Sequence, residues 1–265
     1  MLSIFRRRRR ERLRASTFPP EWRAILQRNV PLFSRLPAAD KEELLGHIQV
    51  FIAEKYWEGC RGLELTDEMK VTIAAQACVL LLHRESDYYP RVTTILVYPS
   101  SYVAQEERNI GGGIWEEGDE ERLGHTHEKM GVIVLAWDAA LHGSRILGDG
   151  PNVVLHEFAH QLDFENASTD GTPVLDTRQQ YISWARVLGA EYDTLRRVDA
   201  SGGSSFLDTY GAKNPAEFFA VVTEMFFERP VELRARHPAL YEELRGFYRQ
   251  DPATFEGMDG PGNSG

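Results

Sequence analysis

Cysteine is scarce in this sequence, in which Cys60 and Cys78 are the only two among 265 residues. Two cysteines are too few for a disulfide framework and cannot form a four-thiolate zinc site, so we expect a reducing, cytoplasmic setting. Long apolar runs are also missing, and none approaches the roughly 18 to 20 residues that a membrane-spanning helix requires. A signal peptide is not predicted, because arginines follow the segment MLSIF where an apolar segment should stand.

Repeats with a period of about 20 to 50 residues are absent as well, which excludes a solenoid or a propeller. The chain is 42% hydrophobic and 26% charged, a composition typical of a globular protein. Two runs rich in β-branched residues predict strands over Thr93–Tyr98 and Gly131–Trp137. Hydrophobic periodicity predicts helices over residues 38–58, 67–83, 152–164, 177–198 and 214–228. Because helices outnumber strands, we predict an α+β fold that is predominantly helical with a small β-sheet.

The net charge of −10 is distributed unevenly along the chain. Residues 1–14 contain seven arginines and one acid, a charge of +6, so the remaining chain carries −16. A body this acidic repels phosphate backbones, and we expect no direct binding to nucleic acid. The run Arg6–Arg10 has the charge to contact an anionic membrane, but a solvated, disordered leader is the favoured interpretation.

A polar, acidic stretch over residues 104–130 separates the two predicted strands. Its composition and its three consecutive glycines predict a loop. A loop of this length in a compact domain is either a lid or specificity element of a functional site or a tolerated insertion. The sequence leaves both interpretations open.

One motif dominates the chemistry of the sequence: His156-Glu157-Phe158-Ala159-His160. On a helix the two histidines lie about 40° apart, so both imidazoles can bind one metal ion. Glu157 projects to one side, where its carboxylate can take a proton from water without being a ligand itself. The flanking apolar residues indicate a helix with one buried side, in which this polar trio would be costly without a metal.

A third protein ligand must come from elsewhere, because no third histidine follows at a short spacing. Glu217 and Glu224 are seven residues apart, hence on one face of another predicted helix, amid apolar residues. The segment Asn214-Pro215-Ala216-Glu217 also has the form of a capping box, in which Glu217 would bond to the helix start. Periodicity alone leaves capping and metal ligation open for Glu217.

Asp163 follows His156 by seven residues and therefore shares its helical face. We interpret Asp163 as an acceptor that orients a ligand histidine without touching the metal, and Glu224 is a second candidate for this role. Solvation at the surface is the alternative for Asp163.

The segments VVLHEFAHQLD and YGAKNPAEFFAVVTEMFFERP resemble the Mlc titration factor A family of zinc metallopeptidases. The resemblance extends over about residues 18–252 and includes the closing segment YEELRGFYRQDP. It implies a zincin-like domain of the gluzincin type, with a core related to that of anthrax lethal factor.

For the site, the resemblance implies one zinc ion (Zn2+) per chain. The implied ligands are His156, His160 and Glu217. Glu157 is implied as the general base, and Tyr210, seven residues before Glu217, as an assisting catalytic tyrosine. The resemblance therefore favours ligation as the main role of Glu217.

These expectations together describe a zinc-dependent peptidase with a peptide or protein substrate. The resemblance favours aminopeptidase-like activity over endopeptidase activity. It also implies an alternative function, a protein-binding regulator that sequesters a sugar-responsive transcription repressor while the metal is structural or regulatory. Glu157 and Tyr210 stand where the chemistry needs them, which favours the enzyme.

The expected domain organisation has three parts. Residues 1–17 form the disordered basic leader, and residues 18–252 form one zinc metallopeptidase domain. Within it, a helical part ends at about residue 90 and a catalytic part follows from 91. Residues 253–265 form a disordered tail. The strand over Gly131–Trp137 is expected to pair with an extended peptide at a sheet edge.

Overall fold

The structure is a computed structural model that describes the chain except for residues 1, 101, 110–114, 123, 128–130 and 256–265, and it describes only the backbone of residues 2–3 and 102–127. The α-helices are α1 (Leu2–Ala15), α2 (Pro20–Asn29), α3 (Pro31–Arg35), α4 (Ala38–Glu54), α5 (Asp67–Val79), α6 (Trp137–Arg145), α7 (Val153–Asp163), α8 (Arg178–Ala200), α9 (Pro215–Glu228), α10 (Pro230–Arg236) and α11 (Pro238–Tyr248). The strands are β1 (Tyr56–Gly59), β2 (Thr94–Tyr98), β3 (Tyr102–Asn109), β4 (Trp115–Arg122), β5 (Gly124–His127) and β6 (Val132–Ala136). Short 3-10 helices are η2 (Phe164–Asn166), η3 (Thr209–Ala212) and η4 (Pro252–Thr254).

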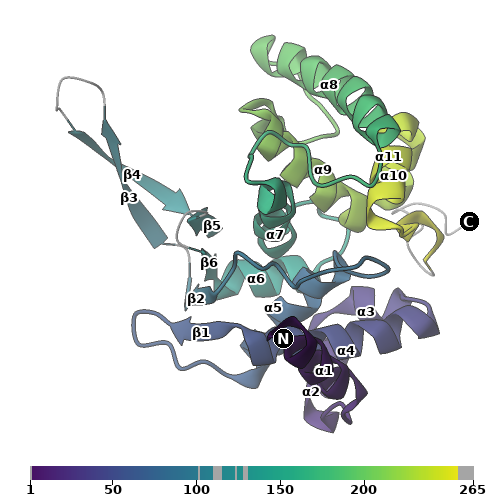
Figure 1. Ribbon diagram of the computed structural model, residues 1–265. Helices are drawn as coiled ribbons and strands as arrows, with labels where there is room; N and C mark the ends of the chain where they lie inside the picture. The colour runs from purple at the N-terminus through teal and green to yellow at the C-terminus, as the bar shows by residue number, and fades with distance from the viewer. Residues whose placement is uncertain (1, 101, 110–114, 123, 128–130, 256–265) are drawn as a thin grey trace, which may run out of the picture.

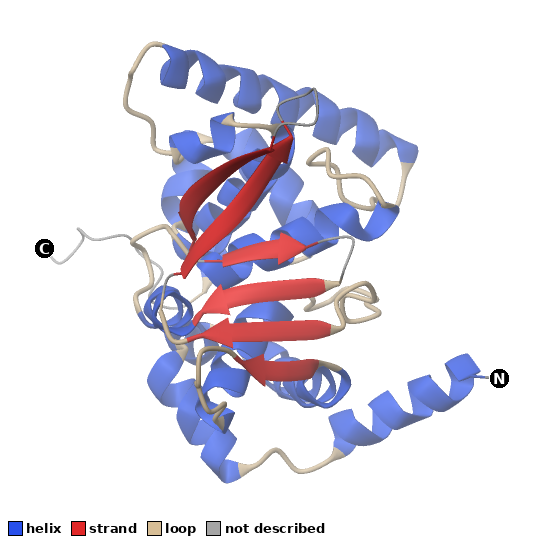
Figure 2. Ribbon diagram, turned by 90° about the vertical axis from the view of Figure 1, so that its left-hand side faces the viewer, coloured by secondary structure: helices blue, strands red, loops and turns tan. Residues whose placement is uncertain are grey.

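Four strands form one mixed sheet in the order β1-β2-β6-β5, and Figure 2 shows them side by side in one layer. Strands β1, β2 and β6 are parallel, whereas β5 runs antiparallel to β6. The predominantly helical α+β fold with a small sheet is thus confirmed. Both predicted strands are also confirmed, as β2 and β6.

Strand β6 lies inside this sheet, between β2 and β5. The prediction that an extended peptide pairs with Gly131–Trp137 is therefore wrong, because both neighbours of that strand are already in place. Strand β5 holds the outer position instead. It escaped the sequence analysis because its four residues, GHTH, carry no apolar alternation.

Helix α7 packs against strands β5 and β6 on one side and against α5, α6 and α9 on others, as Figure 1 shows for the helices around it. Its Phe158 is fully buried, with its ring centroid 5.6 Å from that of Phe51 in α4 and 4.8 Å from that of Tyr89. On the far side of α9, Trp184 of α8 meets Phe219 at 5.7 Å between ring centroids. Burying such side chains contributes roughly 2 to 3 kcal/mol each, which fixes α7 on α4 and α9 on α8.

Side-chain caps set the first residues of helices α7, α8 and α9. Asn152 accepts a hydrogen bond from the N–H of Leu155 at 3.1 Å and begins α7. Asn214 does the same for the N–H of Glu217 at 2.9 Å and begins α9. Thr177 and Gln180 form a reciprocal capping box at the start of α8. These local signals explain why the predicted and observed starts agree within one residue.

The N-terminal arginines do not form the disordered leader that the sequence predicted over residues 1–17. Residues 2–15 are helix α1, which packs on α4. The guanidinium of Arg10 binds Glu54 through hydrogen bonds of 2.8 and 2.7 Å and Asp87 through one of 2.5 Å. Arginine is a good helix former, and these acidic partners, distant in sequence, compensate its charge.

Two further expectations need correction. The helix predicted over residues 38–58 ends at Glu54, and its last residues form β1, which pairs with β2. The stretch over residues 104–130 is not a plain loop, because its described backbone forms an antiparallel pair, β3 and β4, and then β5. Acidic residues have a weak strand preference, so pairing between segments, and not local composition, makes these strands.

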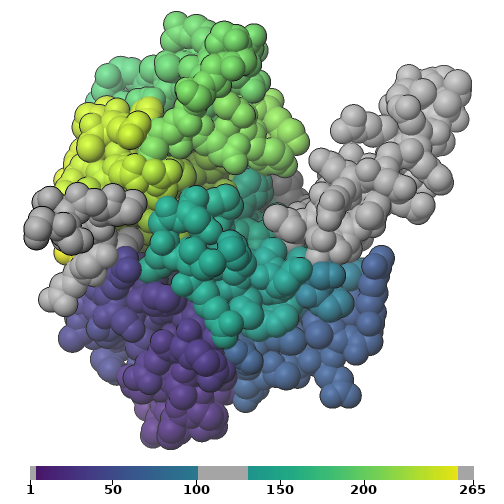
Figure 3. Space-filling model, turned by 180° about the vertical axis from the view of Figure 1, so that it is seen from behind, coloured from purple at the N-terminus to yellow at the C-terminus, as the bar shows by residue number. Residues whose placement is uncertain are grey.

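Seen from behind, the space-filling view shows the N-terminal helices at the bottom, the last helices above them on the left and the middle of the chain in the centre (Figure 3). In the part of the chain that the structure describes, no helix has the length and apolar character to cross a membrane. Residues 256–265, most of the tail predicted to be disordered, lie outside the described residues.

Replacing Arg10 tests whether α1 is part of the folded body. In Arg10→Ala, Glu54, whose side chain is 12% exposed, loses its bidentate partner, so we expect a loss of about 2 to 3 kcal/mol in the free energy of unfolding. Urea unfolding measures this loss. Arg8→Ala on the exposed side of α1 is the control, with an expected change within about 0.5 kcal/mol. Equal stability of both variants would show that the contact does not support the fold.

Candidate metal centre

Three metal-binding side chains converge where α9 begins beside α7. His156 and His160 lie one turn apart on α7, and Glu217 lies in the first turn of α9. Nε2 of His156 is 3.0 Å from Oε2 of Glu217 and 3.2 Å from Nε2 of His160. Nε2 of His160 is 3.3 Å from the same Glu217 oxygen. All three side chains keep a small exposed fraction, 14 to 19%, so the cluster can be reached from solvent.

These distances fit the donor set of a zinc site. Donors bound at about 2.0 to 2.1 Å around a tetrahedral zinc ion lie about 3.3 Å from one another. Two imidazole nitrogens and one carboxylate oxygen are also a typical ligand set of a catalytic zinc, and three donors leave a fourth position open. Among the residues that the structure describes, His156, His160 and Glu217 are the one group of three such side chains with ligand atoms this close.

The carboxylates of Glu217 and Glu224 favour a positive charge on His156, which lies between them. Burial lowers the pKa of His156, but hydrogen bonds with Glu217 and Glu224 outweigh burial and raise it well above its ordinary value. Burial raises the pKa of Glu217, but hydrogen bonds with His156 and His160 hold it well below its usual range. A metal ion binds neutral imidazoles, so its binding here would release a proton.

Glu224 supports His156 from the side opposite to the donor cluster. Its Oε1 is 2.7 Å from Nδ1 of His156, and its Oε2 accepts a hydrogen bond of 2.5 Å from the N–H of Asn152. Asn152 is the residue that caps α7. The structure thus brings Glu224, one of the two predicted orienting residues, to a ligand histidine and directs Nε2 of that ring toward the cluster.

A second buried acid, Glu228, extends this support and was missed by the sequence analysis. It accepts hydrogen bonds from Nδ2 of Asn152 at 3.0 Å and from the N–H of Gly148 at 3.1 Å. Burial raises the pKa of Glu228 to about 8. Its position, eleven residues after Glu217 and so on the same helical face, was the available signal.

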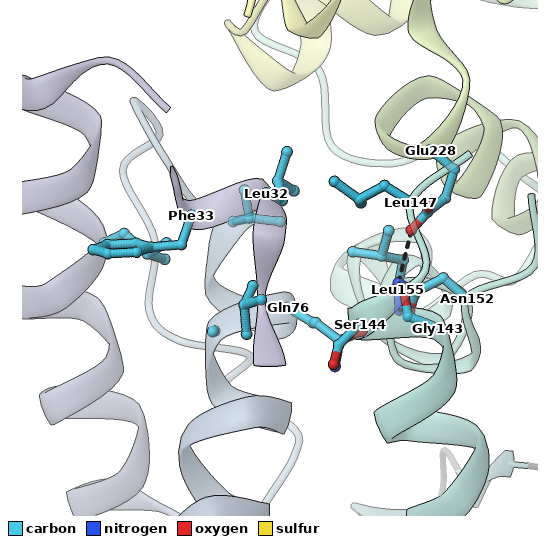
Figure 4. Close-up of a pocket in the computed structure, with 13 residues that line it drawn as sticks. Leu32, Phe33, Gln76, Gly143, Ser144, Leu147, Asn152, Leu155 and Glu228 are labelled. Carbon is cyan, nitrogen blue, oxygen red and sulfur yellow. Dashed lines mark hydrogen bonds between the residues drawn. The ribbon is translucent and has the colours of Figure 1, made fainter. Parts of the chain in front are cut away.

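Figure 4 shows Glu228 and Asn152 joined by their hydrogen bond beside the apolar side chains of Leu147 and Leu155. The cavity at this place has a volume of about 10 Å³. Such a volume holds one water molecule at most. This region is therefore a packed support behind His156 and Glu224 and not a substrate pocket.

Glu157, the neighbour of His156 in the chain, and Tyr210, the tyrosine that the resemblance implied, both lie close to His156. Glu157 is 5% exposed, and its charge contributes to the raised pKa of His156. Tyr210 lies in η3, with its ring centroid 6.0 Å from that of His156. Asp208 accepts a hydrogen bond of 2.9 Å from the N–H of Tyr210, and Nζ of Lys213 lies 4.0 Å from the ring centroid. The tyrosine ring is thus held at the rim of the site, where 42% of it is exposed.

Asp163, the other predicted orienting residue, makes a different contact. Its Oδ2 accepts a hydrogen bond of 2.9 Å from the N–H of Gly171, and its Oδ1 is buried without a hydrogen-bond partner among the described residues. Burial raises the pKa of Asp163 to about 6. The predicted hydrogen bond from Asp163 to a ligand histidine is therefore absent from the described contacts, and Asp163 instead ties the end of α7 to the following turn.

Gly171 is the second residue that the sequence analysis missed. Its φ of +74° and its close approach to Pro215 leave no room for a side chain, because a Cβ there would lie 2.3 Å from the Pro215 carbonyl oxygen. The carbonyl of Gly171 also accepts a hydrogen bond of 3.0 Å from Nε1 of Trp184. This glycine lets the chain after α7 pass directly beside the start of α9, where Glu217 lies.

The structure shows which atoms of Glu217 the helix cap uses and where its carboxylate lies. Asn214 alone caps α9, through its side-chain oxygen and the N–H of Glu217. The carboxylate of Glu217 turns to the two histidines instead of back to the helix start. The N–H of Glu217 thus serves the cap while its carboxylate is left available to a metal ion, and the cap fixes where the carboxylate points.

A His-Glu-x-x-His helix with a glutamate from a neighbouring helix defines the class of metallopeptidase-type metal centres. Sequence comparison gives the family: residues 4–249 match the glucose-regulated metallo-peptidase M90 family, and the chain belongs to it. The resemblance drawn from the two long motifs is thereby confirmed, and the match includes most of α1.

Relatives of similar length support this family membership. "Uncharacterized protein slr2042" of Synechocystis sp. is 39% identical over 244 residues, which cover 92% of this chain and 89% of the relative. "Mlc titration factor A" of Yersinia pestis and that of Yersinia pseudotuberculosis are each 31% identical over 236 residues, which cover 88% of this chain and 85% of the relative.

Removing the charge of Glu224 tests its support of the metal ligand. In Glu224→Gln the hydrogen bond to Nδ1 of His156 loses its ionic partner, so we expect zinc affinity to fall about 10- to 100-fold. Titration of the metal-free protein with zinc against a competing chelator measures the affinity. Glu242→Gln, on the exposed side of α11, is the control and should bind zinc like the unaltered chain. Unchanged affinity in Glu224→Gln would contradict the assigned role.

Proposed function

We propose that this chain is a zinc-dependent peptidase whose active site is the cluster of His156, His160 and Glu217. The observation that supports this most strongly is the triangle of donor atoms with edges of 3.0, 3.2 and 3.3 Å on a helix that also carries Glu157. A zinc ion held there would supply Lewis acidity, which lowers the pKa of water toward about 7 and polarises a carbonyl group.

The chain's own residues perform the proton transfers of this proposal. Glu157 accepts a proton from the attacking water and later delivers it to the nitrogen of the leaving amine. Its place next to His156 in sequence, and on a neighbouring part of the helix surface, supports this role without making it a ligand. Glu224 holds the His156 ring, Asn152 holds Glu224, and Glu228 holds the Asn152 side chain, so that the ring does not rotate while the charge of the site changes.

Tyr210 is proposed to donate a hydrogen bond to the oxyanion that forms from the scissile carbonyl. Three contacts support this role: its ring lies near His156, its backbone is fixed by Asp208, and the cation of Lys213 lies over its ring. A hydroxyl that is positioned before the reaction stabilises the developing charge without reorganisation.

The sheet offers a place for an extended substrate. Strand β5 holds the outer position next to β6, and α7 packs against β5. A peptide that adds to β5 as a further strand would therefore lie along the helix that carries the histidines. The family resemblance favours aminopeptidase-like over endopeptidase activity, and a cytoplasmic location agrees with the free cysteines Cys60 and Cys78.

Cleavage of a mixed peptide library by zinc-loaded protein tests the peptidase proposal. The unaltered chain should cleave, and the products should show whether the first residue or an internal bond is attacked. Glu157→Gln should bind one equivalent of zinc but lose cleavage, because the amide cannot accept the proton of the attacking water. Absence of cleavage by the unaltered, zinc-loaded chain would reject the peptidase.

The hydroxyl of Tyr210 is tested separately. Tyr210→Phe should keep zinc affinity and the melting temperature, since the ring contacts remain. Its kcat on the best library substrate should fall about 10²- to 10³-fold, the loss typical of one oxyanion donor. Steady-state kinetics give the value, and Tyr56→Phe, at an exposed position on β1, is a matched control. Full activity of Tyr210→Phe would remove the hydroxyl from the mechanism.

A second candidate function follows from the name of the Yersinia relatives, Mlc titration factor A. In this alternative the chain binds a sugar-responsive transcription repressor of the Mlc type, and the metal centre is structural or regulatory. Glu157→Gln separates the two functions. If the chain is a binding protein, the unaltered chain cleaves no peptide, and both the unaltered chain and Glu157→Gln retain the repressor in a pull-down.

A further inference from the structure

Helix α1 has one face that is fixed to the body of the protein. Arg10 binds Glu54 and Asp87, and its guanidinium lies 4.7 Å from the ring centroid of Tyr88. Arg14, one turn later, donates a hydrogen bond of 2.8 Å to the Tyr88 hydroxyl. These contacts hold the helix in one orientation, so that its opposite face is presented to solvent as a constant surface.

That opposite face combines two apolar side chains with two arginines. At about 100° per residue, Ile4, Arg8, Arg12 and Phe5 fall within an arc of about 100° on the side away from Arg10. Ile4 is 51% exposed and Phe5 is 63% exposed. Arg8 and Arg12 are exposed and make no hydrogen bond or ion pair with the residues that the structure describes. Figure 2 shows α1 extending away from the sheet toward the N-terminus.

We propose that this face of α1 binds the surface of an anionic lipid bilayer. Ile4 and Phe5, in the first turns of the helix, enter the boundary between headgroups and acyl chains, and Arg8 and Arg12 contact lipid phosphates. An amphipathic helix with apolar residues beside arginines binds in this way, through buried apolar area and attraction to anionic lipid together. The binding is peripheral and reversible, because the face is small.

The charge of the rest of the molecule restricts how the contact forms. Residues 15–265 carry −16 against +6 in residues 1–14, so the body is repelled by an anionic surface. Only the basic helix α1 is attracted to the anionic bilayer, so the molecule approaches the bilayer with α1 first. A nucleic acid would use the arginines but offers no apolar layer for Ile4 and Phe5, and this difference favours the bilayer.

Vesicle sedimentation of the full-length chain tests the proposal. The protein should bind vesicles of phosphatidylcholine and phosphatidylglycerol in a ratio of about two to one and should not bind phosphatidylcholine alone. Charge reversal in Arg8→Glu/Arg12→Glu should weaken binding at least about 10-fold, because each arginine near such a surface contributes about fivefold. Ile4→Ser/Phe5→Ser should weaken it about 10-fold by removing the apolar contact.

A matched control has the same change in net charge elsewhere. Arg178→Glu/Arg186→Glu alters two exposed arginines of α8 and should bind vesicles like the unaltered chain. Equal losses in this control would overturn the proposal, because binding would then follow net charge alone. Failure of the unaltered chain to bind anionic vesicles would also overturn it. The proposal would also be overturned if the chain bound a DNA duplex and this binding were lost in Arg8→Glu/Arg12→Glu but kept in Ile4→Ser/Phe5→Ser.

Discussion

The position of His156 between two carboxylates of one helix is the constraint on which the site depends. Glu217 faces one ring nitrogen and Glu224 the other, and both belong to α9. A slip of one residue along α9 would rotate its acids by about 100° and remove both contacts together. The register of α9 on α7 is therefore fixed by chemistry as well as by packing. Gly171 and Asn152 secure the two ends of this arrangement, through the close passage beside Pro215 and the hydrogen bonds to Glu224 and Glu228.

This constraint also explains why a helix as apolar as α9 carries three buried or half-buried acids on one face. A buried charge is costly unless it is paired and hydrogen-bonded, and each of the three acids has different hydrogen-bond partners. Glu217 meets two imidazoles, and Glu224 meets one imidazole and a backbone N–H. Glu228, whose pKa burial raises to about 8, meets an amide side chain and a backbone N–H. The two carboxylates that contact His156 thus lie at the donor cluster, where they would stabilise a metal cation.

The sequence predicted those features that local chemistry encodes. Periodicity and caps located α7 and α9, and the spacing of the motif singled out His156 and His160 as candidate ligands, with Glu157 beside them, before any contact was known. Glu217 needed the family resemblance, because its cap and its ligation look alike in a sequence. Gly171 and Asn152 could not be recognised, since their importance arises from segments that meet only in the folded chain. The same reason applies to β1 and β5, whose residues become strands through their neighbours in the sheet.

The folding of helix α1 could not be predicted from its own charge either. Seven arginines near one end of an acidic chain predict mutual repulsion and disorder, as long as no partner is considered. In the fold, Glu54 and Asp87, distant in sequence, neutralise one face of the helix, and Tyr88 covers the guanidinium of Arg10. The acidity of the body, which repels anionic partners, is therefore also what holds this basic helix in place. Glu54 and Asp87 contact only one side of α1, so Arg8 and Arg12 on the other side have no acidic partner among the described residues. The basic charge of this segment is therefore presented on one face of the molecule.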